Sequence, residues 1–122
     1  MDCWIQHADF STQDRQVQTE QKLLEFFESI DRAAEDERQV VMMNAGEDWC
    51  PWGIGLNAEG GEMIHVYRED SVRDTFTVLI SKPVPASFLG LFNYRRNQEK
   101  YVEDVDADAA RKMLINFLAE TQ

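Results

Sequence analysis

Two stretches with the apolar spacing of α-helices, one near each end of the 122-residue chain, constrain its fold more than any other feature. The first is predicted to run from Thr19 or Glu20 to Glu35 and the second from Asp106 to about Glu120, with Thr19 and Asp106 as N-caps. The apolar stripe of the first comprises Leu23, Phe27, Ile30 and Ala34, widened by Leu24 and Phe26. That of the second comprises Ala110, Met113 or Leu114, Phe117 and Leu118. Each helix therefore needs a second layer to cover one of its faces.

The chain between these helices is patterned mostly as β-strands. Apolar, β-branched and aromatic residues predict strands at 40–43, 53–56, 63–67, 75–80, 89–94 and 100–102, with an additional edge strand at 3–7. Gly60 and Gly61 predict a hairpin turn, the prolines at 83 and 85 are expected to end a strand, and residues 95–98 to form a polar turn. We therefore expect one α+β domain over residues 1–122, an antiparallel sheet of about five strands with an N-terminal and a C-terminal helix packed on one face.

The chain is strongly acidic, and its charge is unevenly distributed. Twenty-three Asp and Glu against 12 Lys and Arg give a net charge of −11, and because residues 81–122 are neutral the excess lies in residues 1–80. A field of this sign disfavours nucleic acid and anionic membranes, and we expect neither as a partner. It suits a basic protein partner or simple solubility, and composition does not choose between the two. An N-terminus without signal-peptide features leads us to expect a cytoplasmic protein.

No motif in the sequence supports catalysis, metal binding or a cofactor. The segment Asp48-Trp49-Cys50-Pro51-Trp52 lacks the second thiol that thioredoxin-type chemistry needs three residues after Cys50, where the chain has Gly53. His7 and His65, the two histidines of the chain, do not have the spacing of metal ligands. We therefore expect a protein that is not an enzyme and that holds no metal and no cofactor.

What remains is a binding surface in the acidic middle of the chain. Carboxylates placed around aromatic residues suit a positively charged protein, because charges steer the encounter and aromatic side chains hold the complex. The residues predicted to contact a partner are Asp48, Trp49, Trp52, Glu69, Asp70 and Asp74. A structural role stays open for the two tryptophans, which could instead cover an edge of the sheet.

The order of these segments resembles the bacterial immunity proteins that neutralise polymorphic toxins, specifically the family known as the first immunity type. An N-terminal helix of the form Lys22-Leu23-Leu24-x-x-Phe27 leads into a strand, and Gly53-Ile54-Gly55-Leu56 leads through a glycine turn to a strand with an aromatic end. The third part of the likeness is Phe92-Asn93-Tyr94, a polar turn, Tyr101-Val102-Glu103-Asp104-Val105, and a helix from Asp106 that ends in Phe117-Leu118.

This resemblance implies an inhibitor without catalytic activity, which binds one cognate toxin C-terminal domain in the cytosol and covers or distorts its active site. Nuclease and deaminase domains, which occur among the toxins of such families, are often basic and would complement the charge of −11. The protein itself is expected to be a monomer or a weak homodimer. Two alternatives stay open: an acidic secretion chaperone that binds an unfolded effector segment, and a small-molecule enzyme, which would need a pocket with a perturbed acid.

Overall fold

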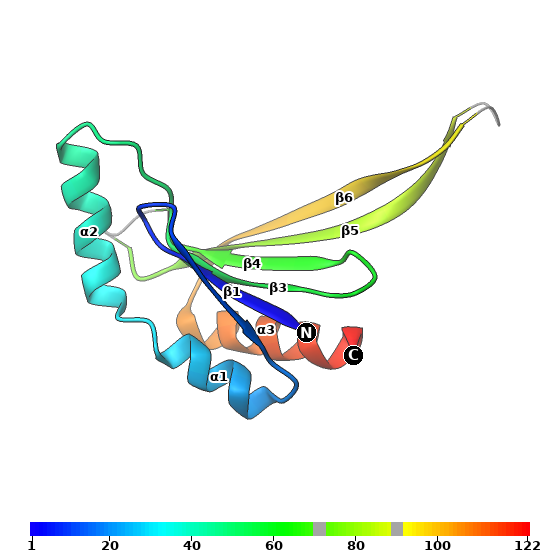
Figure 1. The fold of residues 1–122 in the computed structure, drawn as a ribbon, viewed down its shortest axis with the longest axis horizontal. Helices are drawn as coiled ribbons and strands as arrows, with labels where there is room; N and C mark the ends of the chain where they lie inside the picture. The colour runs from blue at the N-terminus through cyan, green and yellow to red at the C-terminus, as the bar shows by residue number, and fades with distance from the viewer. Residues whose placement is uncertain (70–72, 89–91) are drawn as a thin grey trace.

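In the part of the chain that the structure describes, six antiparallel strands form one sheet, two helices cover one of its faces and a third helix lies beside one end (Figure 1). The structure, a computed structural model, describes residues 1–69, 73–88 and 92–122, without the side chains of residues 84–97. The elements are β1 (Asp2–Gln6), β2 (Thr12–Gln16), α1 (Glu20–Glu28), α2 (Arg32–Asn44), β3 (Gly53–Asn57), β4 (Met63–Tyr67), β5 (Phe76–Phe88), β6 (Phe92–Val105) and α3 (Ala107–Thr121). The strand order in the sheet is β2-β1-β3-β4-β5-β6.

Helices α1 and α3 cover one face of the sheet, as the α+β prediction requires (Figure 1). The strand residues that point to these helices lie opposite one another across the sheet, and they include Cys3, Leu56, Ile64, Ile54 and Val66. The helices contribute the buried side chains Leu23, Phe26, Phe27, Ala110, Leu114, Phe117 and Leu118. Thr19 and Asp106 cap the two helices, each accepting a hydrogen bond from a backbone N–H three residues on.

The predicted helix from Thr19 to Glu35 is instead two helices, and this expectation was wrong. Helix α1 ends at Glu28, and Asp31 begins α2 as its N-cap by accepting a hydrogen bond from the N–H of Ala34. Ala34 is exposed rather than part of a buried stripe. Residues 40–43, predicted as a strand, form the C-terminal half of α2. Their β-branched and apolar side chains suggest a strand, but they belong to a helix whose buried residues are Glu35 and Gln39, and all of them except the half-buried Met42 are exposed.

The N-terminal strand is internal to the sheet rather than at its edge. β1 pairs with β3 on one side and with β2 on the other, so β2 is the edge strand. All five residues of β2 are exposed, and none of them is apolar. A short polar strand of this kind limits edge-to-edge aggregation, and for the same reason it carries no apolar alternation by which the sequence could have predicted it.

Strands β5 and β6 continue well past the rest of the sheet as a projecting hairpin (Figure 1). We call residues 82–88 and 92–98 the arm, because the last pair that joins β5 to β4 is Met63 opposite Ser81. The expected break at the prolines and the expected turn at residues 95–98 are both wrong, since Pro83 lies opposite Asn97 and Pro85 opposite Arg95 in the ladder. The strand predicted at 89–94 falls partly on residues 89–91, which lie outside the described residues.

Candidate protein-binding face

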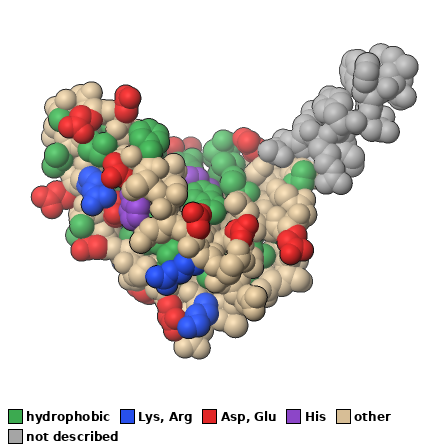
Figure 2. All heavy atoms as spheres, viewed as in Figure 1, with side chains coloured by type: hydrophobic (Ala, Val, Ile, Leu, Met, Phe, Trp, Pro, Cys, Tyr) green, Lys and Arg blue, Asp and Glu red, His purple; other side chains and the backbone are tan. Residues whose placement is uncertain are grey.

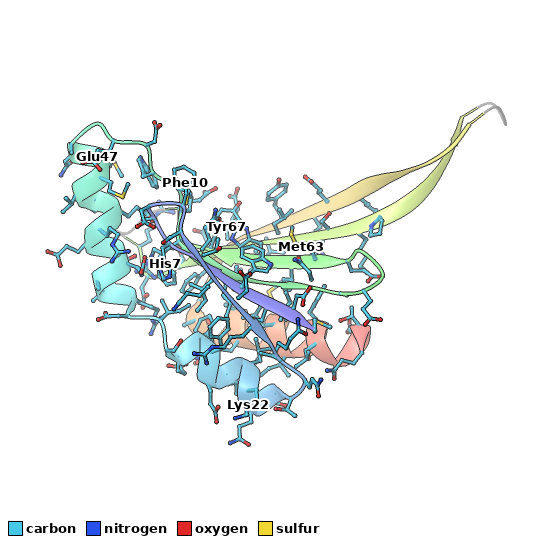
Figure 3. The ribbon with its side chains drawn as sticks, viewed as in Figure 1. His7, Phe10, Lys22, Glu47, Met63 and Tyr67 are labelled. Carbon is cyan, nitrogen blue, oxygen red and sulfur yellow. The ribbon has the colours of Figure 1, made fainter. Side chains whose placement is uncertain are left out.

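The second face of the sheet is not covered by α1 or α3, and we call it the open face. Across five strands and in register, its central row runs from Trp4 in β1 through Gly55, His65 and Leu79 to Tyr101 in β6. Helix α2 stands beside one end of this face and the arm projects beyond the other end (Figure 1). Among the residues labelled in Figure 3, Phe10, Met63 and Tyr67 lie on the side of the sheet away from α1 and α3. The sheet therefore presents aromatic side chains where a second layer would pack.

An aromatic stack forms the centre of the open face. The indole of Trp4 lies directly on Gly55, where an added Cβ would come within 2.1 Å of the indole carbon Cζ2. The ring centre of His65 lies 4.7 Å from that of Trp4 and 4.8 Å from that of Tyr67. All three rings are half-buried. Gly55 is thus needed for close approach, and it allows the tryptophan to lie flat and present one broad surface outward.

His65 is held in its neutral form by this stack. Burial between the two neighbouring rings lowers the pKa of His65 to about 4, because the charged imidazolium loses its hydration there. Its Nε2 atom is buried and has no hydrogen-bond partner among the described residues. The imidazole therefore behaves as an apolar spacer at neutral pH rather than as a proton donor or acceptor.

The folded state should accordingly lose stability as pH falls. Unfolded His65 takes up its proton near pH 6.5 and folded His65 only near pH 4, so the contribution is complete above pH 6.5 and is lost as pH falls towards 4. We expect a loss of about 2 kcal/mol in the free energy of unfolding between pH 7.5 and pH 5. Denaturant unfolding at both pH values measures this loss. In His65→Phe the difference between the two pH values should be smaller by that amount, and equal differences in both proteins would contradict the assignment.

The charges on the open face have one sign. At the strand positions of the six-stranded part that share the parity of Trp4, the face carries Asp2, Asp14, Glu99 and Glu103 and has neither Lys nor Arg. Nearby carboxylates also affect the tyrosines. Burial and the charge of Glu69 raise the pKa of Tyr67, and a hydrogen bond to Glu99 raises that of Tyr101. The face is therefore aromatic at its centre and negative around it.

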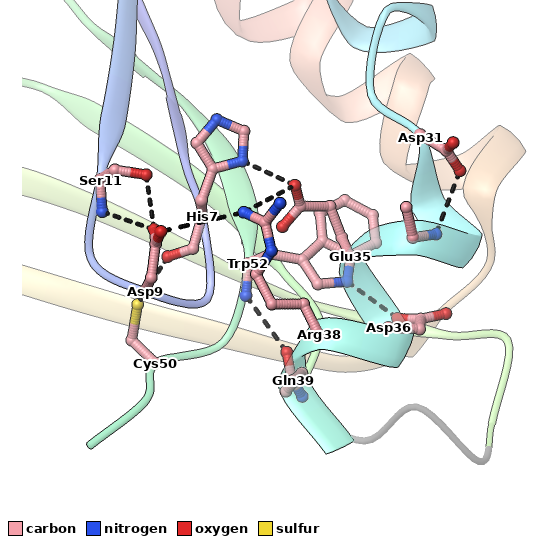
Figure 4. Close-up of polar contacts among 11 residues, drawn as sticks. His7, Asp9, Ser11, Asp31, Glu35, Asp36, Arg38, Gln39, Cys50 and Trp52 are labelled. Atoms are coloured by element: carbon pink, nitrogen blue, oxygen red, sulfur yellow. Dashed lines mark hydrogen bonds and ion pairs between the residues drawn. The ribbon is translucent and has the colours of Figure 1, made fainter. Parts of the chain in front are cut away.

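Polar contacts attach α2 to the end of the sheet (Figure 4). The Nε1–H of Trp52 donates to Asp36 at 2.8 Å, and the side chain of Arg68 forms ion pairs with Asp36 and Asp74, both at 2.9 Å. Gln39 is fully buried, donating to the carbonyl of Arg68 and accepting from the backbone N–H of Trp52. These contacts, made by Asp36 and Gln39, fix α2 beside the open face, and the C-terminal end of α2 lies beyond them.

His7 and Glu35 provide a second attachment of α2, with Nδ1 of His7 2.7 Å from the Glu35 carboxylate. Beyond this attachment, apolar side chains remain exposed at the free end of α2 and in the turn between β1 and β2. The side chain of Val41 is 58% exposed and that of Phe10 53%, so neither belongs to the hydrophobic core. Val40 and Met43 are exposed as well. Figure 2 shows hydrophobic and acidic side chains close together over this end of the molecule.

The residues predicted to contact a partner differ in how exposed they are in the structure. Trp52 is fully buried, with an exposure of 0%, so its predicted contact with a partner is wrong and its structural alternative holds. Asp48 and Glu69 are exposed and Trp49 is half-buried, on loops that meet through the hydrogen bond from Arg68 N–H to the Trp52 carbonyl. Asp74 is exposed but paired with Arg68. Asp70 lies outside the described residues.

The open face itself was not among the predicted sites. The signal that could have found it is the alternation in β4, where Met63, His65 and Tyr67 share one face and Ile64 and Val66 share the other. Large side chains on both faces of one strand indicate a sheet with both faces covered. The two helices predicted from the sequence can cover only one face, which leaves the face of Met63, His65 and Tyr67 as a candidate for binding. Identifying the row across strands needed the register, which the sequence does not contain.

Within the described residues, no group of three or more His, Cys, Asp and Glu side chains could hold a metal ion, and no helix is long and apolar enough to cross a membrane. Burial raises the pKa of the Cys3 thiol to about 12 and also raises that of Cys50, so both cysteines are protonated at neutral pH. In comparisons with known proteins, no family model, no curated protein and no solved structure matches this chain.

Proposed function

We propose that this protein is an inhibitor of the immunity-protein type, which binds the folded, basic domain of a cognate toxin on its open face. The observation that carries the proposal is an aromatic sheet face with carboxylates around it and with no Lys or Arg at its described strand positions in the six-stranded part of the sheet. Monomeric proteins usually cover a face of this kind or use it for binding. The resemblance to the first immunity type, drawn from the sequence, supports the same function.

In this proposal the carboxylates of the face speed association with the toxin domain, and its aromatic rings provide most of the binding energy. Asp2, Asp14 and Glu99 attract a basic domain at long range, which raises the association rate in a manner that salt screens. Trp4 and Tyr67 are rigid rings of the type that dominates binding energy when water is excluded around them. In this proposal Asp48, Trp49 and Glu69 extend the contact at the end of the sheet near α2, and the toxin is blocked in the cytosol by occlusion of its active site.

The test is co-expression with the toxin domain encoded by the gene immediately upstream, followed by co-purification. Trp4→Ala should shorten the lifetime of the complex at least tenfold, because the flat ring on Gly55 is lost. Asp2→Lys with Asp14→Lys should slow association and weaken its dependence on salt. The matched control is Glu25→Lys with Glu120→Lys, which makes the same change of charge on α1 and α3, on the opposite side of the sheet.

Melting of the free variants separates binding from folding. A complex whose lifetime and association rate are unchanged in the open-face variants would show that the partner uses another surface. Association with an unfolded effector segment, and not with the folded toxin domain, would favour the secretion-chaperone alternative. Failure to bind either would contradict the proposed function as a whole.

A further inference from the structure

The arm has one blocked edge and one open edge. On the β5 side, Pro83 and Pro85 have no backbone N–H to donate, and the β3–β4 turn comes close to Pro83, since a Cβ added to Gly61 would lie 3.0 Å from Pro83 Cγ. On the opposite side, β6 runs for 14 residues without a proline, and among the described strands it pairs only with β5. Its unpaired backbone groups are a template for another strand.

The positions of the prolines also indicate which residues of β6 point their backbone N–H and C=O groups to the outer edge of the sheet. A proline fits opposite a paired strand only where its nitrogen points away from that strand, and Pro83 and Pro85 lie opposite Asn97 and Arg95. The N–H and C=O groups of Asn97 and Arg95 therefore point to the outer edge, as do those of alternate neighbours such as Glu99. These groups are available for a ladder with a second chain.

We propose that the outer edge of β6 pairs antiparallel with the β6 edge of a second copy, across a twofold axis at Asn97. Such an axis places one residue opposite its own copy, and each choice of that residue fixes the whole register. Centring at 95, 96, 99 or 100 puts a charged residue opposite itself. Centring at 98 puts Arg96 opposite Lys100, and centring at 101 puts Glu99 opposite Glu103.

Of the registers from 95 to 101, only that centred at Asn97 avoids like charges opposite one another. It places Arg95 of each copy opposite Glu99 of the other, and these pairs use the outward-facing backbone groups. It also places Phe92 opposite Val102 and Tyr94 opposite Lys100. Cross-strand pairs of opposite charge and of apolar residues are the ones that stabilise a sheet.

The shape of the molecule permits this pairing. The axis at Asn97 lies in the arm, beyond the pairing of β5 with β4, and the arm projects away from the helices (Figure 1). Two bodies would therefore lie at opposite ends of a paired arm. Each copy carries a charge of −11, so the association is best measured near physiological salt, where repulsion between the bodies is screened. Glu99 lies both on the open face and in this ladder. The pairing itself needs no toxin domain, so the dimer is measured on the protein alone and does not depend on the proposed function.

The test is the mass of the full chain in solution as its concentration rises, by sedimentation equilibrium or light scattering. We expect a shift from 14.2 kDa towards twice that mass. Arg95→Glu or Glu99→Arg alone should weaken the dimer about tenfold, because two attractive pairs become repulsive, and the two changes combined should restore it. A chain that stays monomeric at millimolar concentration, or a dimer whose dissociation constant is the same in these variants, would overturn the proposal.

A backbone variant gives an independent test. Asn97→Pro should abolish the dimer without removing a hydrogen bond between β5 and β6, since the nitrogen of residue 97 faces outward, and Asn97→Thr should leave the dimer intact. Hydrogen exchange adds a readout that needs no substitution: the amides of Arg95, Asn97 and Glu99 should become protected as concentration rises. Protection that does not change with concentration would also overturn the pairing.

Discussion

Replacing Trp52 by alanine should lower the free energy of unfolding by about 3–5 kcal/mol, a large part of the stability of a small domain. The indole is fully buried, its ring packs edge-on against Phe76 with ring centres 5.7 Å apart, and its N–H is bound to Asp36. Truncation would leave a cavity between α2 and the sheet and remove one hydrogen bond of the contact that positions α2. Denaturant unfolding followed by circular dichroism measures the loss.

Trp49→Ala is the matched control for Trp52→Ala, because the two tryptophans are three residues apart and only Trp49 is half-buried. We expect it to cost about 1 kcal/mol or less in the free protein. Equal losses in the two variants would contradict the different burial of the two side chains. The same pair of variants, measured for binding, tests whether Trp49 belongs to the partner surface.

Phe27→Ala should cost about 3–5 kcal/mol as well, for a different reason. Phe27 joins α1 both to the sheet and to α3: its ring lies 6.3 Å from that of Phe76 in β5, and the guanidinium of Arg111 from α3 lies 5.4 Å from its centre. Removing the ring therefore loosens α1 from the sheet and from α3 together. Thermal and denaturant unfolding are the measurements.

Leu24 on the same helix provides the comparison. Its side chain is half-buried and lines a shallow surface depression with Glu20 and Glu28, so Leu24→Ala should cost clearly less than Phe27→Ala. If Phe27→Ala melted within a degree or two of the unaltered protein, α1 would not be docked on the sheet as described. A comparable loss in both variants would place Leu24 in the core as well.

Local sequence predicted the elements whose signals are contained within a few residues. Asp106 with the apolar spacing up to Leu118 defines α3, and Gly61, which has a φ of +92°, allows the turn between β3 and β4. These features depend on backbone conformation and on one apolar face, and both are properties of a short segment. The α+β class followed from the same signals, because amphipathic helices and apolar strands leave few ways to bury their faces.

Tertiary structure decided the features in which a segment depends on a distant partner. Residues 40–43 have the composition of a strand, yet Gln39 and Asp36 find their partners in Trp52 and Arg68, and these contacts keep the segment helical. Likewise the prolines stay in β5 because their nitrogens can face an edge that β4 does not reach. The open face exists only through the register that brings Trp4, Gly55 and His65 into one row. Periodicity along one strand shows which residues share a face, but pairing between strands far apart in the chain decides which residues meet.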